Sequence, residues 1–196
     1  MKLSLWEGSA EFASICQRWR DTLFESLDLP VMEETVNRFH KMCFKMERGL
    51  PPNKKVPLFR DMIDTQRNML PVIQALSNKA LKERHWMKIE GIIGKPVPRD
   101  KPELFSLGFL FDLDVGQFKD EISVASTEAT QELALEEMLA KINAKWAEIE
   151  FTCIQFKDSK DMVILTGIDE VTIALEDSMV TMSTILASRL VLSFQN

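Results

Sequence analysis

The sequence predicts a mainly α-helical protein, an elongated antiparallel bundle of about seven helices with one β-hairpin near the C-terminus. The 196 residues include 7 glycines and 8 prolines, which gather in a few stretches and leave long segments without a helix breaker. Within these segments apolar residues recur at spacings of three and four, as on one face of a helix. Between residues 151 and 167 the spacing changes to two, which is typical of a hairpin.

Three helices are expected in the N-terminal part of the chain, at residues 8–27, 29–48 and 56–76. Asp28 is a suitable N-cap for the second helix, because its carboxylate can accept a bond from a free backbone N–H. Pro71 lies inside the third helix and should kink it, because its ring clashes with the preceding turn. The residues predicted to face inward are Phe12, Cys16, Trp19 and Leu23 in the first helix, Met32, Val36, Phe39, Cys43, Met46 and Leu50 in the second, and Met62, Met69, Ile73 and Leu76 in the third.

A loop at 49–55 separates the second helix from the third, and a fourth helix is expected after the third. Ser77 and Asn78 are both suitable caps for its start, because their short polar side chains accept bonds from free N–H groups. Gly91 or Gly94 should end it, because glycine adopts the left-handed conformation common at that position.

A stretch with three prolines interrupts the helical pattern at residues 96–105. Proline lacks the N–H that a helix interior needs, so this stretch reads as a connection between folded parts. We therefore predict two helical subdomains, 1–95 and 106–196. Ser106 should cap a short helix at the start of the second subdomain.

The C-terminal part of the chain should hold two longer helices at 116–127 and 129–149, then the β-hairpin at 151–167 with a five-residue turn, then a last helix. Asp169 is a suitable cap for that last helix. The residues predicted to face inward are Leu135, Leu139, Ile142, Trp146 and Ile149 before the hairpin, and Val171, Leu175, Met179, Met182 and Leu186 after it.

Composition excludes several classes of function. The net charge is −6, which argues against non-specific nucleic-acid binding, because such binding needs a basic face, although it leaves room for one local basic patch. No run of apolar residues is long enough for a membrane span or a secretory signal. The three cysteines, Cys16, Cys43 and Cys153, lie far apart and form no CxxC pair. This favours a reducing, cytosolic setting over a disulfide framework.

Motifs that would carry chemistry fail on spacing. The glycines of "GIIGK" at 91–95 have two residues between them, whereas a phosphate loop needs four. The turn "DLDVG" at 112–116 lacks calcium ligands at the required positions. His40 and Cys43 are two candidate metal ligands without a third, and a packed pair explains them better. The sequence therefore predicts no catalytic, cofactor-binding or metal-ligating residue and no enzymatic activity.

The run Arg84-His85-Trp86 holds one of the 2 histidines and one of the 4 tryptophans. Successive helix residues point about 100° apart, so the three side chains cannot converge on one ligand atom. The run is interpreted first as a structural anchor, in which the indole buries. The alternative is a binding surface, because arginine and tryptophan are enriched at interfaces.

The segment around this run resembles a signature of the dynein heavy chain linker region. In "LPVIQALSNKALKERHW", residues 70–86, a helix with a Leu-Pro dipeptide precedes the family pattern NxxLxxRHW. The matching positions are Asn78, Leu81, Arg84, His85 and Trp86.

Further matches follow in the order of the family. They are the helix end "WRDTLFESLD", the start "SLG" of a helix at 106–108, the helix "EATQELALEEMLAKINAKWAEIEF", and the hairpin-helix unit "FKDSKDMVILTGIDEVTIALEDSMVTMSTILASR". The last of these is similar to axonemal heavy chains in particular. The resemblance therefore covers nearly the whole chain.

The resemblance implies a mechanical function without catalysis. The linker of a dynein is a largely helical arm that bends and straightens across the motor ring and so couples ATP-driven changes to movement along microtubules. ATP binds in modules outside this segment, so no cofactor is expected here. Expected partners are the motor ring of the same heavy chain and, through the full complex, intermediate chains, light chains and microtubules, in the cytoplasm, cytoskeleton and axoneme of cilia and flagella. The alternative is a free-standing scaffold or adaptor with the linker fold. The structural or interface candidates are Asn78, Leu81, Arg84, His85, Trp86 and Trp146.

Overall fold

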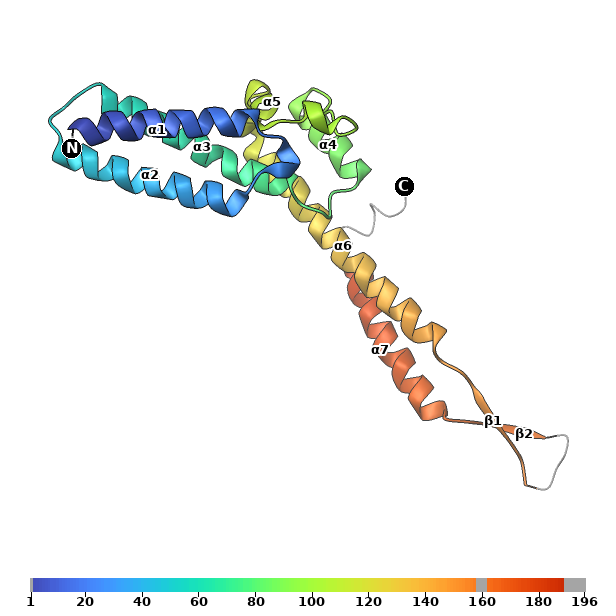
Figure 1. Cartoon of the computed structure of the whole chain (residues 1–196). Coiled ribbons are helices and arrows are strands. Elements are labelled where there is room, and N and C mark those ends of the chain that lie inside the picture. Colours follow the sequence, from blue (N-terminus) through green and yellow to red (C-terminus); the bar gives the residue numbers. More distant parts are fainter. Residues whose placement is uncertain (1, 158–161, 189–196) are drawn as a thin grey trace. The chain divides into compact units, whose positions relative to one another are not determined.

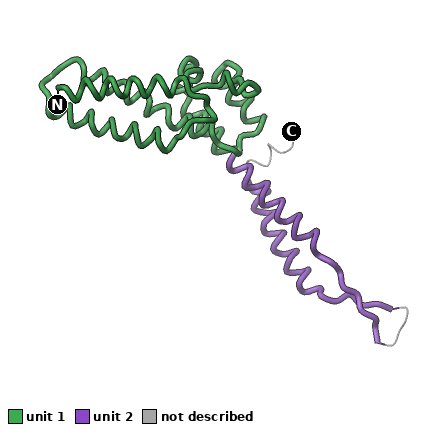
Figure 2. The backbone as a smooth tube through the Cα atoms, viewed as in Figure 1, with its two compact units in different colours: residues 1–129 green, residues 130–196 purple. Residues whose placement is uncertain are grey.

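The computed structural model describes residues 2–157 and 162–188, and these form seven α-helices, three short 3₁₀ helices and one two-stranded antiparallel sheet (Figure 1). The predicted mainly helical class, with seven helices and one β-hairpin near the C-terminus, is confirmed in these residues. The chain divides into two compact units, residues 1–129 and 130–196 (Figure 2). The elements are α1 Lys2–Asp21, η1 Phe24–Ser26, α2 Leu29–Gly49, α3 Lys55–Leu76, α4 Glu83–Ile93, η2 Pro102–Leu104, α5 Leu107–Asp112, η3 Val115–Phe118, α6 Lys119–Ala147, β1 Thr152–Gln155, β2 Val163–Thr166 and α7 Ile168–Ala187.

Helices α1, α2 and α3 form an antiparallel three-helix bundle at the N-terminal end of the first unit (Figure 1). The apolar stripe of α2 is buried between its neighbours, as its 4-3-4-3 spacing predicts. Asp28 caps α2 by accepting a hydrogen bond from the Val31 N–H at 3.1 Å, which confirms the predicted cap. Three rings meet at the centre, where Phe12 lies 4.8 Å from Phe39 and 6.1 Å from Phe59 between ring centroids. The buried residues of this cluster are Leu5, Phe12, Cys16, Val36, Phe39, Cys43, Met46, Val56, Phe59 and Ile63.

The predicted extent of the first helix was wrong at its C-terminal end. Helix α1 ends at Asp21, and Leu23, which was expected to face inward, is 39% exposed. After the helix the backbone pairs with a later segment, because the Phe24 N–H donates to the Phe105 carbonyl at 2.8 Å. Leu23 and Ser106 form a β-bridge beside this bond. The long-range pairing satisfies backbone groups that a longer helix would have satisfied internally.

Helix α3 runs through Pro71 without interruption from Lys55 to Leu76. Its predicted inward residues Met69, Ile73 and Leu76 are buried, whereas Met62 is half-buried. A bend at the proline remains a prediction. The C-terminal half of α3 belongs to a second apolar cluster in the same unit. The buried members of that cluster are Phe24, Met32, Met69, Val72, Ile73, Ala75, Leu76, Ile89, Val97, Phe105, Leu107, Leu110, Val115, Ile122 and Ala125.

The proline-rich connection at 96–105 lies within the first compact unit. Val97 and Phe105 are both buried in its second apolar cluster. Ser106 then caps α5 by accepting a hydrogen bond from the Phe109 N–H at 3.2 Å, which confirms the predicted cap. The division of the chain into subdomains at 96–105 stays a prediction, while the compact units divide between Ala129 and Thr130.

The two helices predicted at 116–127 and 129–149 are one helix. Helix α6 spans Lys119–Ala147 without a break, so the predicted division was wrong. The helix continues because no glycine or proline stands at residues 127–129, and Glu128 and Ala129 are good helix formers. Among the predicted inward residues Leu135 is buried; the half-buried ones are Leu139, Ile142, Trp146 and Ile149.

The second unit contains the hairpin and α7. Strands β1 and β2 pair antiparallel, with Cys153 opposite Leu165, which confirms the hairpin. Most of its predicted turn lies outside the described residues, at 158–161. The predicted cap of α7 was wrong, because Gly167 occupies that position at φ 74° and Asp169 lies in the first turn.

The predicted inward stripe of α7 was largely wrong as well. The helix packs on α6 with a face of smaller residues, of which Ala174 and Ser178 are buried together with Ile185. Ser178 accepts a hydrogen bond from the indole N–H of Trp146 on α6 at 2.9 Å, and Asp177 beside it pairs with Lys145 of the same helix at 3.4 Å. Val171 is half-buried as expected, but the other predicted residues are exposed: Leu175, Met179, Met182 and Leu186.

Candidate interaction site around Trp86

Two general findings restrict the chemistry of the described part of the chain. No three His, Cys, Asp or Glu side chains among these residues lie close enough together to hold a metal ion. None of the described helices combines the length and the apolar character that crossing a membrane requires. The buried thiols are poor nucleophiles, because burial raises the pKa of Cys16 to about 11 and also raises the pKa of Cys43. Cys153, in the hairpin, is exposed.

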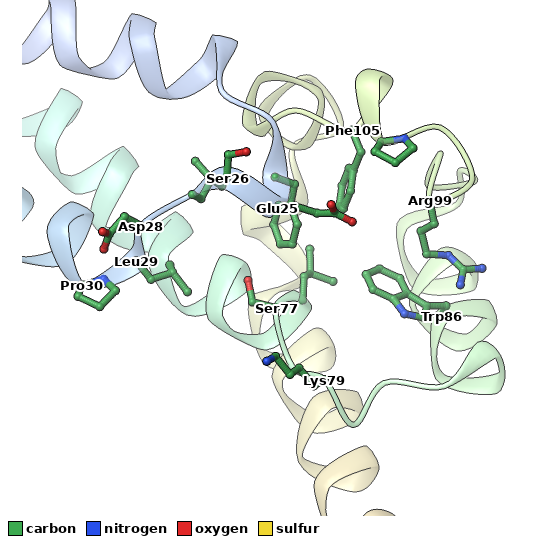
Figure 3. Close-up of a pocket in the computed structure, with 14 residues that line it drawn as sticks. Glu25, Ser26, Asp28, Leu29, Pro30, Ser77, Lys79, Trp86, Arg99 and Phe105 are labelled. Carbon is green, nitrogen blue, oxygen red and sulfur yellow. The ribbon is translucent and has the colours of Figure 1, made fainter.

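A wide cavity of the first unit lies beside Trp86. It is an open groove of about 880 Å³. Figure 3 shows Trp86 and Arg99 on one side of it and Asp28, Leu29 and Pro30 on the other. The walls come from the segment between α1 and α2, the end of α3, the start of α4 and the loop before α5. The groove is therefore built by the segments that connect helices, where functional side chains commonly gather.

The connection between α3 and α4 is held by Asn78. Its Nδ2 donates to the carbonyl oxygen and to the hydroxyl oxygen of Ser126 on α6, each at 2.9 Å, and its Oδ1 accepts from the Ala80 N–H at 3.0 Å. Residues 77–82 consequently form a turn rather than the start of a helix, so the predicted cap at Ser77 or Asn78 was wrong. The side-chain amide of Asn78 forms hydrogen bonds within the turn and to another helix. An asparagine side chain that is used in this way is not available to cap a helix.

The cap of α4 is made by His85 instead. Its Nδ1 accepts a hydrogen bond from the Lys82 N–H at 3.0 Å, while its own backbone N–H donates to the Lys82 carbonyl at 3.0 Å. The imidazole thus takes the part that a glutamate or glutamine plays at the third position of a capping box. His85 is 4% exposed, so its ring is enclosed by the fold. The helix ends at Gly94 with φ 75°, one of the two ends that the sequence allowed.

Trp86 and Arg99 form the charged aromatic wall of the groove. The guanidinium carbon of Arg99 lies 5.1 Å from the centroid of the indole ring, within range of a cation–π interaction. The same guanidinium donates two hydrogen bonds to the Glu83 carboxylate, at 2.9 and 2.6 Å. The hydrogen bonds from Arg99 lower the pKa of Glu83, and this pairing raises the pKa of Arg99. The hydrogen bonds between Arg99 and Glu83 thus hold the loop before α5 against the first turn of α4.

The opposite part of the groove is apolar with mixed charge at its rim. The rings of Phe24 and Phe105 stack with their centroids 4.4 Å apart. Glu25 and Asp28 line the groove from one segment, and Lys79 lines it from another. Aromatic and arginine side chains around an apolar floor are typical of surfaces that contact protein. They supply neither a nucleophile with a base nor a phosphate cradle.

The candidate residues from the sequence are brought together in part. Asn78, His85 and Trp86 lie within the α3–α4 segment; Leu81 packs against the second apolar cluster, and Arg84 is half-buried on α4. Trp146 lies in the other unit, where its indole N–H donates to the Ser178 hydroxyl at 2.9 Å.

Sequence reasoning missed Arg99 and Ser126. Arg99 lies in an irregular loop and Ser126 is a single polar residue on a long helix, so no periodic pattern marked either of them. The roles of the six candidates remain predictions, and their surroundings favour an anchor.

The fold and the site together define a class: a mainly helical protein segment whose first unit carries an open groove lined by aromatic and charged side chains. Comparison with known proteins then gives the family. The model of "Dynein heavy chain, N-terminal region 2" matches residues 1–196, and the chain belongs to this family.

Relatives of the chain agree with that assignment. It is 35% identical over 189 residues to dynein axonemal heavy chain 6 of Homo sapiens, covering 96% of this chain and 4% of the relative. It is 30% identical over 193 residues to dynein axonemal heavy chain 2 of Homo sapiens, covering 97% and 4%. It is 28% identical over 194 residues to the dynein-1-beta heavy chain, flagellar inner arm I1 complex, of Chlamydomonas reinhardtii, again covering 97% and 4%. The chain thus spans about 4% of the length of these relatives.

Proposed function

We propose that the chain is a non-catalytic mechanical segment of a dynein heavy chain linker, which couples ATP-driven changes of the motor ring to movement along microtubules in cilia and flagella. The observation that carries this proposal is the match of the family model over all of residues 1–196. The axonemal names of the relatives support the setting in the axoneme. The partners are the motor ring of the same heavy chain and, through the full complex, intermediate chains, light chains and microtubules.

The arrangement around Trp86 supports a mechanical role. A segment that transmits force must resist deformation between its helices. Asn78 ties the α3–α4 turn to α6, and Arg99 ties the next loop to α4. These bonds join elements that lie far apart in sequence, which local helix propensity cannot do.

The test uses a full-length heavy chain that contains this segment. Asn78→Ala and Trp86→Ala should slow microtubule gliding several-fold while basal ATP hydrolysis stays within about twofold, because the hydrolysing modules are separate. Asn68→Ala, at an exposed position of α3, is the matched control and should glide normally. A motor that glides at the wild-type rate after deletion of residues 70–86 contradicts the proposal.

The second candidate function is a free-standing helical scaffold or adaptor. The groove beside Trp86, with its aromatic and arginine lining, favours it to some degree. Isolation of the chain from cells as a separate polypeptide on a partner other than a heavy chain would favour this alternative over the linker.

A further inference from the structure

Helix α7 carries a seam of mostly apolar residues whose side chains are exposed among the described residues. The seam is formed by Ile168, Thr172, Leu175, Met179, Met182 and Leu186. Its spacing alternates strictly between four and three over the whole helix, which is the a/d pattern of a coiled coil. The four largest apolar residues of its C-terminal part are between 37% and 65% exposed.

The seam is distinct from the face of α7 that contacts α6. That face carries Ser178, which accepts a hydrogen bond from Trp146 of α6. The buried Ala174 and Ile185 and the half-buried Val171 lie on the same face, and each of the four residues directly precedes a seam residue. Adjacent helix residues point about 100° apart, so α7 has two separate packing faces. One face lies toward α6, and the other has the periodicity of a helix interface but stays exposed within the part of the chain that the structure describes.

The charges beside the seam select a partner. With the seam residues at a and d, Asp169 and Glu176 fall at e, the position that forms ion pairs between helices of a coiled coil. The g positions, among them Ser178, face α6, so the e side alone is available for such pairs. From Ile168 to Ala187 the helix has no lysine or arginine. A partner helix that places basic residues next to its own seam complements this face.

We propose that the seam of α7 binds an amphipathic helix with leucine-type residues at a and d and lysine or arginine at the flanking positions. A second copy of this chain is disfavoured, because its own acidic e positions would face Asp169 and Glu176. A lipid surface is disfavoured as well, because helices that lie on membranes carry a basic polar face. This inference stands on the second unit alone and is independent of the proposed function.

The test measures binding of a designed three-heptad helix to the chain by fluorescence anisotropy. The probe carries leucine at a and d and lysine at e and g; a matched probe carries glutamate at e and g. The lysine probe should bind at least tenfold more tightly than the glutamate probe, and Glu176→Lys should narrow that ratio several-fold. The preference should also fall as salt is raised, because exposed ion pairs are screened.

Substitutions at two adjacent residues distinguish specific binding at the seam from non-specific hydrophobic binding. Met179 and Val180 are 62% and 69% exposed, but only Met179 belongs to the seam. Met179→Glu should weaken binding of the lysine probe at least tenfold, whereas Val180→Glu should change it less than twofold, with equal helix content by circular dichroism for both variants. Equal effects of the two substitutions overturn the proposal, as does absence of binding to the lysine probe. The proposal is also overturned if the chain does not bind the probe and instead self-associates, or binds anionic vesicles, in a way that Met179→Glu abolishes.

Discussion

Asn78 offers the sharpest test of how the α3–α4 turn is held. Its side chain makes hydrogen bonds at 2.9, 2.9 and 3.0 Å to Ser126 and Ala80, which are both buried. Replacing Asn78 with alanine removes these bonds. Each contributes about 1 kcal/mol net, so we expect a loss of about 2–4 kcal/mol in the free energy of unfolding. For a unit of this size that corresponds to a fall of roughly 10 °C in Tm.

The assay is equilibrium urea unfolding followed by tryptophan fluorescence, with hydrogen exchange as a local readout. Exchange at residues 77–82 should accelerate in Asn78→Ala, because the turn loses its tie to α6. The matched control is Asn68→Ala, which should change stability by less than about 0.5 kcal/mol, because Asn68 is exposed. The reasoning is refuted if Asn78→Ala unfolds at the wild-type urea concentration and leaves the exchange of 77–82 unchanged.

Three further predictions concern a close approach, an ion pair and the thiols. Gly108→Ala should destabilise the chain by about 1–3 kcal/mol, because the added Cβ would lie 2.9 Å from the Arg20 carbonyl oxygen, whereas Gly116→Ala, with nothing within 4 Å, should be neutral in the same urea titration. Glu83→Gln should lower stability at pH 7, because the lowered pKa of Glu83 gives stability that is fully present above the unfolded pKa of about 4.3 and is lost as pH falls through the folded pKa. Unfolding curves at several pH values measure the difference, and a difference that stays constant from pH 7 to the acid end of the series counts against the pair. A thiol reagent at pH 8 should label Cys153 at once and the two buried cysteines only on unfolding, as mass spectrometry of the labelled peptides will show.

Local signals in the sequence were sufficient for much of the fold. The stripe of α2 repeats every three or four residues, so its buried face followed from the helix period alone. Asp28 and Ser106 cap the helices that follow them, because a cap bond joins residues three apart in the chain. The hairpin was predictable for the same reason, since its strands are close in sequence.

Features that depend on distant residues were not predictable. Asn78 was expected to cap a helix, but Ser126, 48 residues later, offers two acceptors and holds the amide elsewhere. His85 could then act as the cap, a use for which histidine gives no sequence signal. Arg99 pairs with Glu83 across 16 residues, from a loop without periodicity. In each case the partner decides the role of the side chain, and the partner comes from another element.

Helix α7 shows a different limit of prediction from sequence, because two stripes of residues in it could each have been the buried face. The stripe through Leu175 and Met179 satisfies the helix period, and so does the smaller stripe through Ala174 and Ser178. Hydrophobicity alone favours the first, yet the helix packs on α6 with the second. Periodicity states which residues share a face, but which face a neighbour covers depends on the shape of that neighbour. The larger stripe then remains as exposed apolar surface, and the acidic residues beside it are the reason to propose a helix partner for it.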